Sequence, residues 1–567
     1  MKKILILVFS LLIFSCKSKL PVAELPAPKE YGLITEKAMV VSARAEASQI
    51  ASDIMKQGGN AFDAMVATEM ALAVSYPFAG SLGGGGFMVY RKADGEVGSL
   101  DFREKAPLAA SKDMYLDEDG NAVPEKSQLG SLAIGVPGTV AGIFSVHEKM
   151  GSLPLGQILA PVIELAIRGY VVTPGQAESF NSQKGIFNRI NKREILYSKT
   201  FEAGDTVKNP ALVGTLKKLV ANGKGEYYGG ETGKILVNFI QEHGGIITLE
   251  DLQKYQTVWR EPVTFNYKGL KIISMAPPSS GGVALAQIMK MIENFPIKEY
   301  GHNSIKTIQV LTEAERRAYA DRSFYLGDTD FFNVPLDVLV SEDYLKNRIK
   351  SFSFDFATPS SEMKHGKIPG YESDETTHYS IVDQFGNAIA VTSTLNGAYG
   401  SKLYVEELGF FLNNEMDDFS SKPGVPNMFG LIGAEANAIE PEKRMLSSMT
   451  PTIVEKDGKF WMTVGTPGGS TIITSVLQTI LNVAEFDMTM QEAVNAPRFH
   501  HQWLPDEILF EPNAFDKDLL ETLKNKGYNI NEGDSRILGK VDAILRLPNG
   551  KLEGGADKRG DDTAVGF

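Results

Sequence analysis

Cysteine is almost absent from this sequence of 567 residues, which contains only Cys16. A single cysteine excludes an intramolecular disulfide and any Cys-x-x-Cys metal or redox motif, so packing must stabilise the fold. Basic residues are also in deficit, because 57 Lys and Arg against 70 Asp and Glu give a formal net charge of -13. Such a chain has no basic footprint for nucleic acid, and we expect no nucleic-acid partner.

Several catalytic and cofactor motifs are missing as well. The seven histidines form no His-Glu-x-x-His pattern, which leaves a zinc site with little support. There is no Gly-x-Ser-x-Gly elbow of an α/β-hydrolase, and the run Gly83 to Gly86 lacks the Gly-x-Gly-x-x-Gly spacing of a dinucleotide site. We therefore expect no metal and no cofactor. A composition with 43% hydrophobic and 22% charged residues is that of a folded, globular chain.

The N-terminus has the pattern of an export signal. Lys2-Lys3 precede an apolar run, Ile4 to Phe14, that is shorter than the ~20 helical residues needed to span a bilayer. The run ends in Leu12-Ile13-Phe14-Ser15-Cys16, which resembles a bacterial lipobox, where the cysteine is lipidated and becomes the mature N-terminus. We expect a signal peptide over residues 1–16 and a tether over 17–35. An ordinary cleaved signal with an incidental cysteine is the alternative.

After the tether, the first half of the chain reads as mainly helical. Helical spacing runs from Ala45 to Met55, and Asn60 can cap a second helix with a broad apolar face. A short strand is expected at Phe87 to Tyr90, followed by a mostly helical stretch from Ala109 to Lys367. The polar segment from Lys364 to Ser373 then indicates an exposed boundary.

Strands and hairpins dominate beyond this boundary. His378 to Val382 and Ala388 to Thr394 flank a Gln384-Phe385-Gly386-Asn387 turn. A hairpin centred near Phe385 places Thr376 opposite Thr394, so that two hydroxyls meet at its open end.

A second hairpin turns at Asp457-Gly458. Its register places Ser447 opposite Gly468, unless a bulge shifts the pairing by one residue. Ser470 to Val483 reads as a helix, so Gly468 and Gly469 lie at a strand-to-helix turn, where backbone amides are available as donors. A third hairpin is predicted around Asn549-Gly550, and together these patterns indicate a sheet sandwiched by helices.

The threonine pair Thr376-Thr377 is the first feature with catalytic potential. A threonine at a chain N-terminus can activate its hydroxyl through its own α-amine, whose ordinary pKa of about 7.7–8.0 leaves a neutral fraction near physiological pH. Thr376 is internal, so the chemistry requires cleavage of the Glu375-Thr376 bond. Taken alone, the pair also reads as two ordinary β-strand residues, and His378 reads as a structural strand residue.

Several motifs, in order along the chain, together resemble the bacterial γ-glutamyltranspeptidases, which are N-terminal nucleophile hydrolases. The residues that carry this resemblance are Gly58-Gly59-Asn60-Ala61, Gly83 to Met88, Asp101-Phe102-Arg103-Glu104, Val136-Pro137-Gly138-Thr139, Pro277 to Gly282, Thr376 to Ser380, Asn413 to Ser420, Leu446-Ser447-Ser448-Met449 and Pro467-Gly468-Gly469-Ser470. Their joint order covers nearly the whole chain after the signal.

The resemblance implies an α/β fold of four αββα layers and a proenzyme that cuts itself before Thr376. A large chain, 36–375, and a strand-rich small chain, 376–567, would remain associated as a heterodimer. Thr376 matches the nucleophile, and Thr394 matches the residue that hydrogen-bonds the nucleophile and its amine.

The resemblance also implies a binding site for a glutamyl group. Three side chains match contacts to the α-carboxylate, and three match groups that hold the α-ammonium: Arg103, Ser447 and Ser448 for the carboxylate, and Asn396, Glu415 and Asp418 for the ammonium. Gly468 and Gly469 match the oxyanion hole. Pro423 to Gly430 matches a loop that covers the glutamyl group, and Phe429 stands where several bacterial members carry tyrosine.

These matches imply a γ-glutamyltransferase and glutathione hydrolase that transfers the acyl group to water, amino acids or dipeptides. With the signal, they predict a periplasmic lipoprotein held to the membrane only through a lipid on Cys16. Two alternatives remain: a related acylase acting on glutaryl or cephalosporin side chains, and a noncatalytic lipoprotein that binds amino acids. Arg103 with Glu415 and Asp418 argues against the acylase, because a glutaryl group has no α-ammonium.

Overall fold

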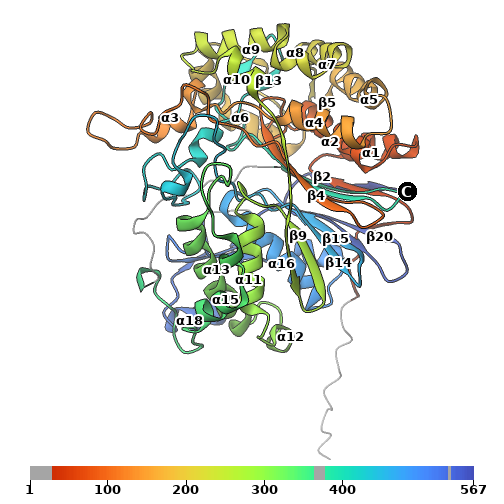
Figure 1. Ribbon diagram of the computed structural model, residues 1–567. Coiled ribbons are helices and arrows are strands. Elements are labelled where there is room, and N and C mark those ends of the chain that lie inside the picture. The colour runs from red at the N-terminus through yellow and green to blue at the C-terminus, as the bar shows by residue number, and fades with distance from the viewer. Residues whose placement is uncertain (1–27, 363–376, 534–537) are drawn as a thin grey trace, which may run out of the picture.

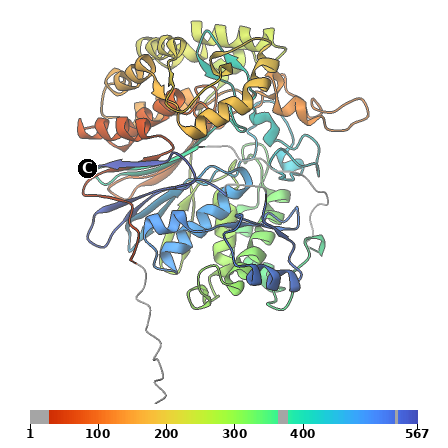
Figure 2. The same cartoon turned by 180° about the vertical axis from the view of Figure 1, so that it is seen from behind.

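The computed structural model describes residues 28–362, 377–533 and 538–567. Two seven-stranded antiparallel sheets lie face to face in its centre, and helices cover both outer faces (Figure 1). The view from behind shows the same layers (Figure 2). The predicted αββα sandwich is confirmed.

Both sheets combine strands from the two sides of residue 376. The first sheet contains, from edge to edge, β21 (Thr563–Gly566), β2 (Met39–Ser42), β10 (Thr377–Val382), β11 (Ala388–Thr394), β3 (Gly85–Arg91), β4 (Val97–Asp101) and β7 (Val258–Arg260). The second contains β1 (Leu33–Thr35), β20 (Leu552–Ala556), β19 (Asp542–Arg546), β15 (Lys459–Gly465), β14 (Thr452–Lys456), β9 (Leu270–Ser274) and β8 (Val263–Tyr267).

Each sheet is covered by its own group of helices. Those above the first sheet in Figure 1 are α1 (Ala45–Lys56), α2 (Ala61–Ser75), α4 (Thr139–Met150), α5 (Leu155–Arg168), α6 (Pro174–Asn191), α7 (Pro210–Asn222), α8 (Lys224–Tyr228), α9 (Glu231–Glu242) and α10 (Leu249–Lys254). Those below the second sheet include α11 (Gly281–Ile292), α13 (Ile305–Tyr325), α15 (Glu342–Ile349), α16 (Ile472–Ala484), α17 (Met490–Asn495) and α18 (Lys517–Asn525). One large apolar cluster fills the upper helical layer. A second fills the space between the two sheets and the space between the second sheet and the lower helices.

The two predicted N-terminal helices form α1 and α2. The Asn60 side chain accepts hydrogen bonds from the backbone N–H groups of Phe62 and Asp63, and the Asp63 carboxylate accepts one from the backbone N–H of Asn60. This capping box satisfies donors that the first helical turn leaves unpaired. All of α2 is buried, because it lies between the first sheet and the surrounding helices.

One prediction for the large chain is incomplete and one needs correction. The described part of the stretch from Ala109 to Lys367 is mostly helical, as expected, but it also contains β8 and β9, which form a hairpin at the edge of the second sheet. The last three residues of the predicted tether, 33–35, form β1, which pairs with β20. All three strands, β1, β8 and β9, lie at or next to a sheet edge, where a short segment with a weak sequence pattern is stabilised by a neighbouring strand.

The β10–β11 hairpin has the predicted register. Thr377 pairs with Ser393, His378 with Thr392, and the ladder continues to Val382 and Ala388. Thr376 lies outside the described residues, one position before Thr377, whereas Thr394 is the last residue of β11. The third predicted hairpin, β19–β20, is also present.

The predicted pairing of Ser447 with Gly468 is wrong. A bulge between Val454 and Glu455 shifts the β14–β15 register by one residue, and the ladder stops at Thr452 and Val464. Ser447 instead forms a bridge with Ser279. The extra residue of the bulge is Trp461 on β15, and beyond the end of the ladder the loop that precedes β14 leaves β15 and joins the segment before α11.

A buried carboxyl group fixes the β10–β11 hairpin to the upper helices. Glu69 on α2 accepts hydrogen bonds from Tyr379 Oη at 2.8 Å and Ser393 Oγ at 2.6 Å. Burial raises the pKa of Glu69 above 4.5, although both hydroxyls oppose the shift. Glu69 therefore holds both strands close to the open end of the hairpin, which follows Thr376 in the sequence.

The pH dependence of stability should reveal this group. Because the folded-state pKa of Glu69 is raised, the protein loses stability as pH rises from about 4.5 toward that pKa. Glu69→Gln removes this titration, so its deficit in melting temperature should narrow between about pH 5 and about pH 8. Glu69→Ala, which leaves two hydroxyls unpaired, should cost about 2–4 kcal/mol. If the melting temperature of Glu69→Gln fell further below that of the wild type as pH rises, the raised pKa of Glu69 would be contradicted.

Candidate functional site

A narrow cavity of about 20 Å³ lies at the end of β11, beside the start of α16. The residues that line it are Arg103, Thr394, Asn396, Asp418, Phe429, Leu431, Ser447, Ser448, Met449, Gly469 and Ile472. Eight of these are site residues expected from the sequence. Segments separated by more than 300 residues therefore converge on one small space.

A buried ion-pair network forms one wall of the cavity. Arg103 follows β4, and its guanidinium donates to Asp418 Oδ2 at 2.5 Å and forms an ion pair with Glu415. A third carboxylate, on Glu104, lies 3.8 Å from Arg103 Nη1. The Tyr255 hydroxyl donates to the Arg103 carbonyl at 2.8 Å and fixes the backbone. A planar guanidinium with several donors is suited to such shared contacts with carboxylates.

The three carboxyl groups and the guanidinium influence one another. Burial raises the pKa values of Glu104, Glu415 and Asp418, and repulsion from neighbouring carboxylates adds to the shift at Glu104 and Glu415. Arg103 opposes the shift at each of these groups. The network therefore keeps one permanent positive charge beside carboxyl groups that respond to any further charge entering the cavity.

Two serine hydroxyls face the same cavity, and both accept hydrogen bonds from protein donors. Ser447 Oγ accepts from the Met449 backbone N–H at 3.1 Å, and Ser448 Oγ accepts from Arg322 Nη2 at 3.1 Å. A hydroxyl that accepts from an N–H keeps its own proton for another acceptor. Ser447 and Ser448 therefore offer donors to an anionic ligand, as the resemblance implies.

Thr394, the last residue of β11, and Asn396 also line the cavity. The Asn396 backbone N–H donates to Thr394 Oγ1 at 2.7 Å, and the Asn396 amide donates to the Asn414 carbonyl at 3.0 Å. Asn396 has a φ of 71°, a left-handed conformation that asparagine tolerates better than most residues. This turn brings the end of β11 next to the segment that carries Glu415.

The strand-to-helix turn at Gly468 and Gly469 is present as predicted. β15 ends at Gly465, and a single turn of 3₁₀-helix, Gly469–Thr471, leads into α16. Gly468 and Gly469 have φ values of 137° and 50°, which favour glycine. A Cβ on Gly469 would lie 2.5 Å from a ring carbon of Phe429. Close packing against that ring therefore requires glycine at 469.

The segment from Pro423 to Gly430 closes over the cavity. Phe429 is 4% exposed, and its ring lies against Gly469. Asn427 Nδ2 donates to Asp418 Oδ1 at 2.9 Å, so the segment is tied to the carboxylate that also contacts Arg103. Closure of this segment is thus coupled to the ion-pair network.

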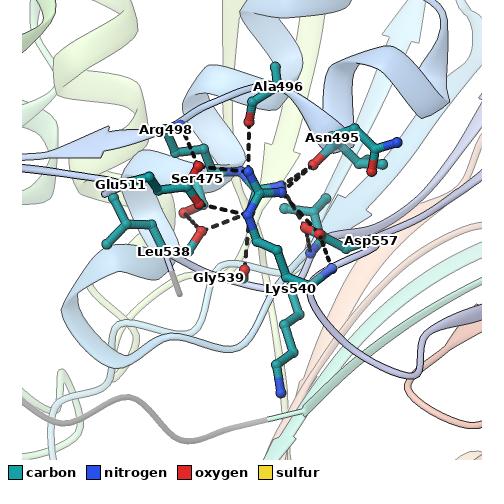
Figure 3. Close-up of polar contacts among 12 residues, drawn as sticks. Ser475, Asn495, Ala496, Arg498, Glu511, Leu538, Gly539, Lys540 and Asp557 are labelled. Carbon is teal, nitrogen blue, oxygen red and sulfur yellow. Dashed lines mark hydrogen bonds and ion pairs between the residues drawn. The ribbon is translucent and has the colours of Figure 1, made fainter. Parts of the chain in front are cut away.

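A second charged cluster supports the glycine turn from behind (Figure 3). Arg498 donates to the Leu538 and Gly539 carbonyls and pairs with Asp557, which also pairs with Arg559. The Lys540 backbone N–H donates to Thr466 Oγ1 at 2.7 Å. The cluster therefore fixes the segment against which the turn packs, since a Cβ on Gly468 would lie 3.5 Å from Gly539.

Four further points complete the comparison with the sequence. Thr376 and Cys16 lie outside the described residues, so the structure places neither. His378 is buried between Thr392 and Ser380, and burial lowers its pKa to about 3. Arg322 was missed, although its helix carries many charged residues at buried helical positions, an unusual pattern that could have marked it. Among the described residues, no three His, Cys, Asp or Glu side chains are grouped to hold a metal ion.

Comparison with known proteins gives a consistent picture. A family model described as Gamma-glutamyltranspeptidase matches residues 47–567. A glutathione hydrolase proenzyme of Escherichia coli is 45% identical over 93% of this chain and 92% of its own length. The solved structure of Helicobacter pylori gamma-glutamyltranspeptidase is 42% identical, with a TM-score of 0.56, over 59% of this chain and 97% of that one. A cephalosporin acylase from Bacillus halodurans shares the fold, with a TM-score of 0.83 at 24% identity over 98% of this chain and 99% of that one.

Replacing Gly469 with alanine should test the turn. The new Cβ would displace the Phe429 ring and strain a backbone at φ 50°, so the turn and the closed segment would shift. We expect kcat for a γ-glutamyl anilide to fall by about 100-fold or more.

The matched control is Gly458→Ala, in the β14–β15 turn. Its φ is 71°, and nothing lies within 4 Å of the added Cβ. It should lower the melting temperature through backbone strain and leave kcat unchanged. Equal losses of kcat in both variants would show that strain alone, and not the contact with Phe429, accounts for the effect.

Proposed function

The chain belongs to the gamma-glutamyltranspeptidase family, and from this premise we propose how its own residues perform the reaction. The protein is a self-processing γ-glutamyltransferase and glutathione hydrolase. Its nucleophile is Thr376, whose α-amine is released when the Glu375-Thr376 bond is cut. One observation carries the assignment of roles. Arg103, which forms ion pairs with two buried carboxylates, lines the same cavity as Thr394 and Gly469.

Recognition of the glutamyl group uses the charges of the network. A γ-glutamyl donor brings an α-carboxylate and an α-ammonium, which match a guanidinium and two carboxylates lying side by side. Arg103, Ser447 and Ser448 supply donors to the carboxylate, whereas Glu415 and Asp418 accept from the ammonium. Asn396 completes the ammonium side through its side-chain oxygen. The ligand thus replaces internal ion pairs with equivalent external ones, which limits the cost of desolvating its charges.

Chemistry takes place at the other end of the glutamyl chain. Thr376 Oγ attacks the γ-carbonyl carbon, and the α-amine of Thr376 accepts the hydroxyl proton. The backbone N–H groups of Gly468 and Gly469 stabilise the oxyanion, and the amine then protonates the leaving nitrogen. Thr394 holds the nucleophile and its amine in place. A γ-glutamyl ester on Thr376 remains.

The ester has two fates. Water hydrolyses it to glutamate, or the amino group of an amino acid or dipeptide attacks it and forms a new γ-glutamyl bond. Both routes regenerate Thr376. No cofactor takes part in either step.

The alternative functions require different groups in the site. A glutaryl acylase has no use for carboxylates that bind an ammonium, and here Glu415 and Asp418 both face Arg103 within one network. A noncatalytic binding protein would need neither cleavage at Thr376 nor a glycine turn at the reacting end.

We also propose that the protein is a periplasmic lipoprotein. The support is the lipobox-like sequence ending at Cys16, which together with the tether would hold the folded part at a membrane surface through lipid alone. Among residues 28–362, 377–533 and 538–567, no helix has the length and hydropathy to cross a membrane.

Removing the nucleophile should prevent both processing and catalysis. Thr376→Ala should remain a single chain of 567 residues less its signal, whereas the wild type should yield a small chain whose N-terminus is Thr376. Mass spectrometry and N-terminal sequencing of the purified, signal-free protein make the measurement.

Thr377→Val is the matched control for this prediction. The Thr377 hydroxyl is buried and has no hydrogen-bond partner among the described residues, so its loss should change neither cleavage nor turnover. A wild-type protein that hydrolyses γ-glutamyl donors at full rate while residues 375 and 376 remain joined would overturn the assigned mechanism.

Lipidation predicts a change of cell fraction. The full-length protein should appear in the membrane fraction with a mass that exceeds that of its polypeptide, and Cys16→Ala should abolish the added mass. Activity of the soluble form should be unaffected, because none of the residues that line the cavity belongs to the predicted signal or tether. Recovery of unmodified wild-type protein in the soluble periplasmic fraction would favour an ordinary cleaved signal.

A further inference from the structure

A buried arginine lies behind the serine pair of the cavity. Arg322 belongs to α13, in the helical layer below the second sheet, and is 4% exposed. Its Nε donates to Ser280 Oγ at 2.9 Å, and its Nη2 donates to Ser448 Oγ at 3.1 Å. Arg322 thus contacts the site only through hydroxyl groups.

Arg322 differs from its neighbours on α13 in having no ion pair. Arg316 pairs with Asp506, and Arg317 pairs with Glu313 at 2.6 Å. Within the described part of the chain, no Asp or Glu lies within 4.0 Å of the Arg322 guanidinium. Asp418 is the carboxylate whose field acts on it from farther away.

A buried cation without a paired anion is costly. Burial lowers the pKa of Arg322 to about 10, which still leaves it charged at neutral pH. Proteins usually neutralise such a charge or pair it. The cost is offset if an anion enters the site during function, and the adjacent cavity is the place where the donor's α-carboxylate binds.

The contacts of Arg322 reach both serines of the carboxylate site. Ser448 accepts directly. Ser280 Oγ accepts from Arg322 and donates to the Ser447 carbonyl at 2.6 Å, while the Ser280 backbone N–H donates to the same carbonyl at 2.8 Å. Arg322 therefore fixes the Ser447-Ser448 backbone as well as one of its hydroxyls.

Hydrogen-bond polarity gives this arrangement a direction. A guanidinium only donates, so Ser448 Oγ must accept from it and must send its own proton elsewhere. The open direction is the cavity that Ser448 lines. Without Arg322, the hydroxyl could rotate and present its lone pairs to an incoming carboxylate, which would repel it.

We propose that Arg322 is a positioning residue for the α-carboxylate of the γ-glutamyl donor, acting through Ser448 and Ser280. It orients the Ser448 hydroxyl as a donor and supplies the second positive charge that the site needs once Arg103 is shared among carboxylates. This inference rests on the proposed function, since it concerns recognition of the same donor.

Kinetics of Arg322→Met should show a binding defect. Without Arg322, the Ser448 hydroxyl is no longer held as a donor to the bound carboxylate. Loss of this charge-assisted hydrogen bond predicts a rise in KM for a γ-glutamyl anilide of about 10- to 100-fold. The value of kcat should change little, because the reacting atoms lie at the other end of the glutamyl chain. Arg322→Lys, which keeps the charge, should recover part of the loss.

A double-mutant cycle separates positioning from simple structural support. If Arg322 acts in part through Ser448, the loss of donor binding in the variant carrying both Arg322→Met and Ser448→Ala should be smaller than the sum of the two single losses, expressed as free energies. Additive losses in the double variant would overturn the proposal, as would an unchanged KM in Arg322→Met.

Arg317→Met is the matched control, since it removes another buried guanidinium from α13. It should lower the melting temperature and leave KM unchanged, because Arg317 contacts Glu313 and the segment after α15 rather than the cavity. If Arg322→Met fails to cleave itself, the cycle is run with Arg322→Lys, for which the same non-additivity is expected.

The outcome is distinguishable from failure of the proposed function. All variants are assayed as cleaved, two-chain protein beside the wild type. A wild type that cleaves neither itself nor any γ-glutamyl donor would overturn the function. A wild type that does both, together with Arg322 variants of normal KM, would overturn only the role of Arg322.

Discussion

Compensation of buried charge is the constraint on which this site depends. Arg103 is 1% exposed, and it is stable there because Glu415 and Asp418 contact its guanidinium. The same contacts hold the segment that carries the two acids close to the end of β4. Asp418 also binds Asn427, so the covering segment depends on the network as well. The proposed recognition of the ligand and the closure of the cavity thus share one set of charges.

The reacting end of the cavity is built by different means. There the backbone determines the geometry. The end of β11 and the turn at Gly468 and Gly469 line the same cavity. Glycine permits the φ values of this turn and leaves room for Phe429. A rigid hairpin, anchored by Glu69, and a turn supported by the Arg498 cluster face one another. In the proposed function, the charges around Arg103 select the ligand, and the end of β11 and the glycine turn position it.

Local patterns predicted much of this arrangement. The β10–β11 register followed from turn position alone, and the αββα layers and cavity residues followed from family motifs. The pairing of Ser447 with Gly468 failed because a bulge depends on packing between sheets, which a turn sequence does not encode. The β8–β9 hairpin was missed because its strands are short and lie at an edge. The sequence did not indicate Arg322, because its proposed role depends on a contact between α13 and a loop that is distant in the sequence.

The order of strands also bears on what becomes of the molecule once its chain is cut. In the first sheet, β2 lies between β21 and β10, and β11 pairs with β3, so pieces from either side of the cut are interleaved. In the second sheet, β14 pairs with β9. With the pairing of β1 and β20 included, separating the pieces would break five such ladders at once and open both apolar layers. The product of cleavage should therefore melt as one cooperative body and should not exchange its halves between molecules.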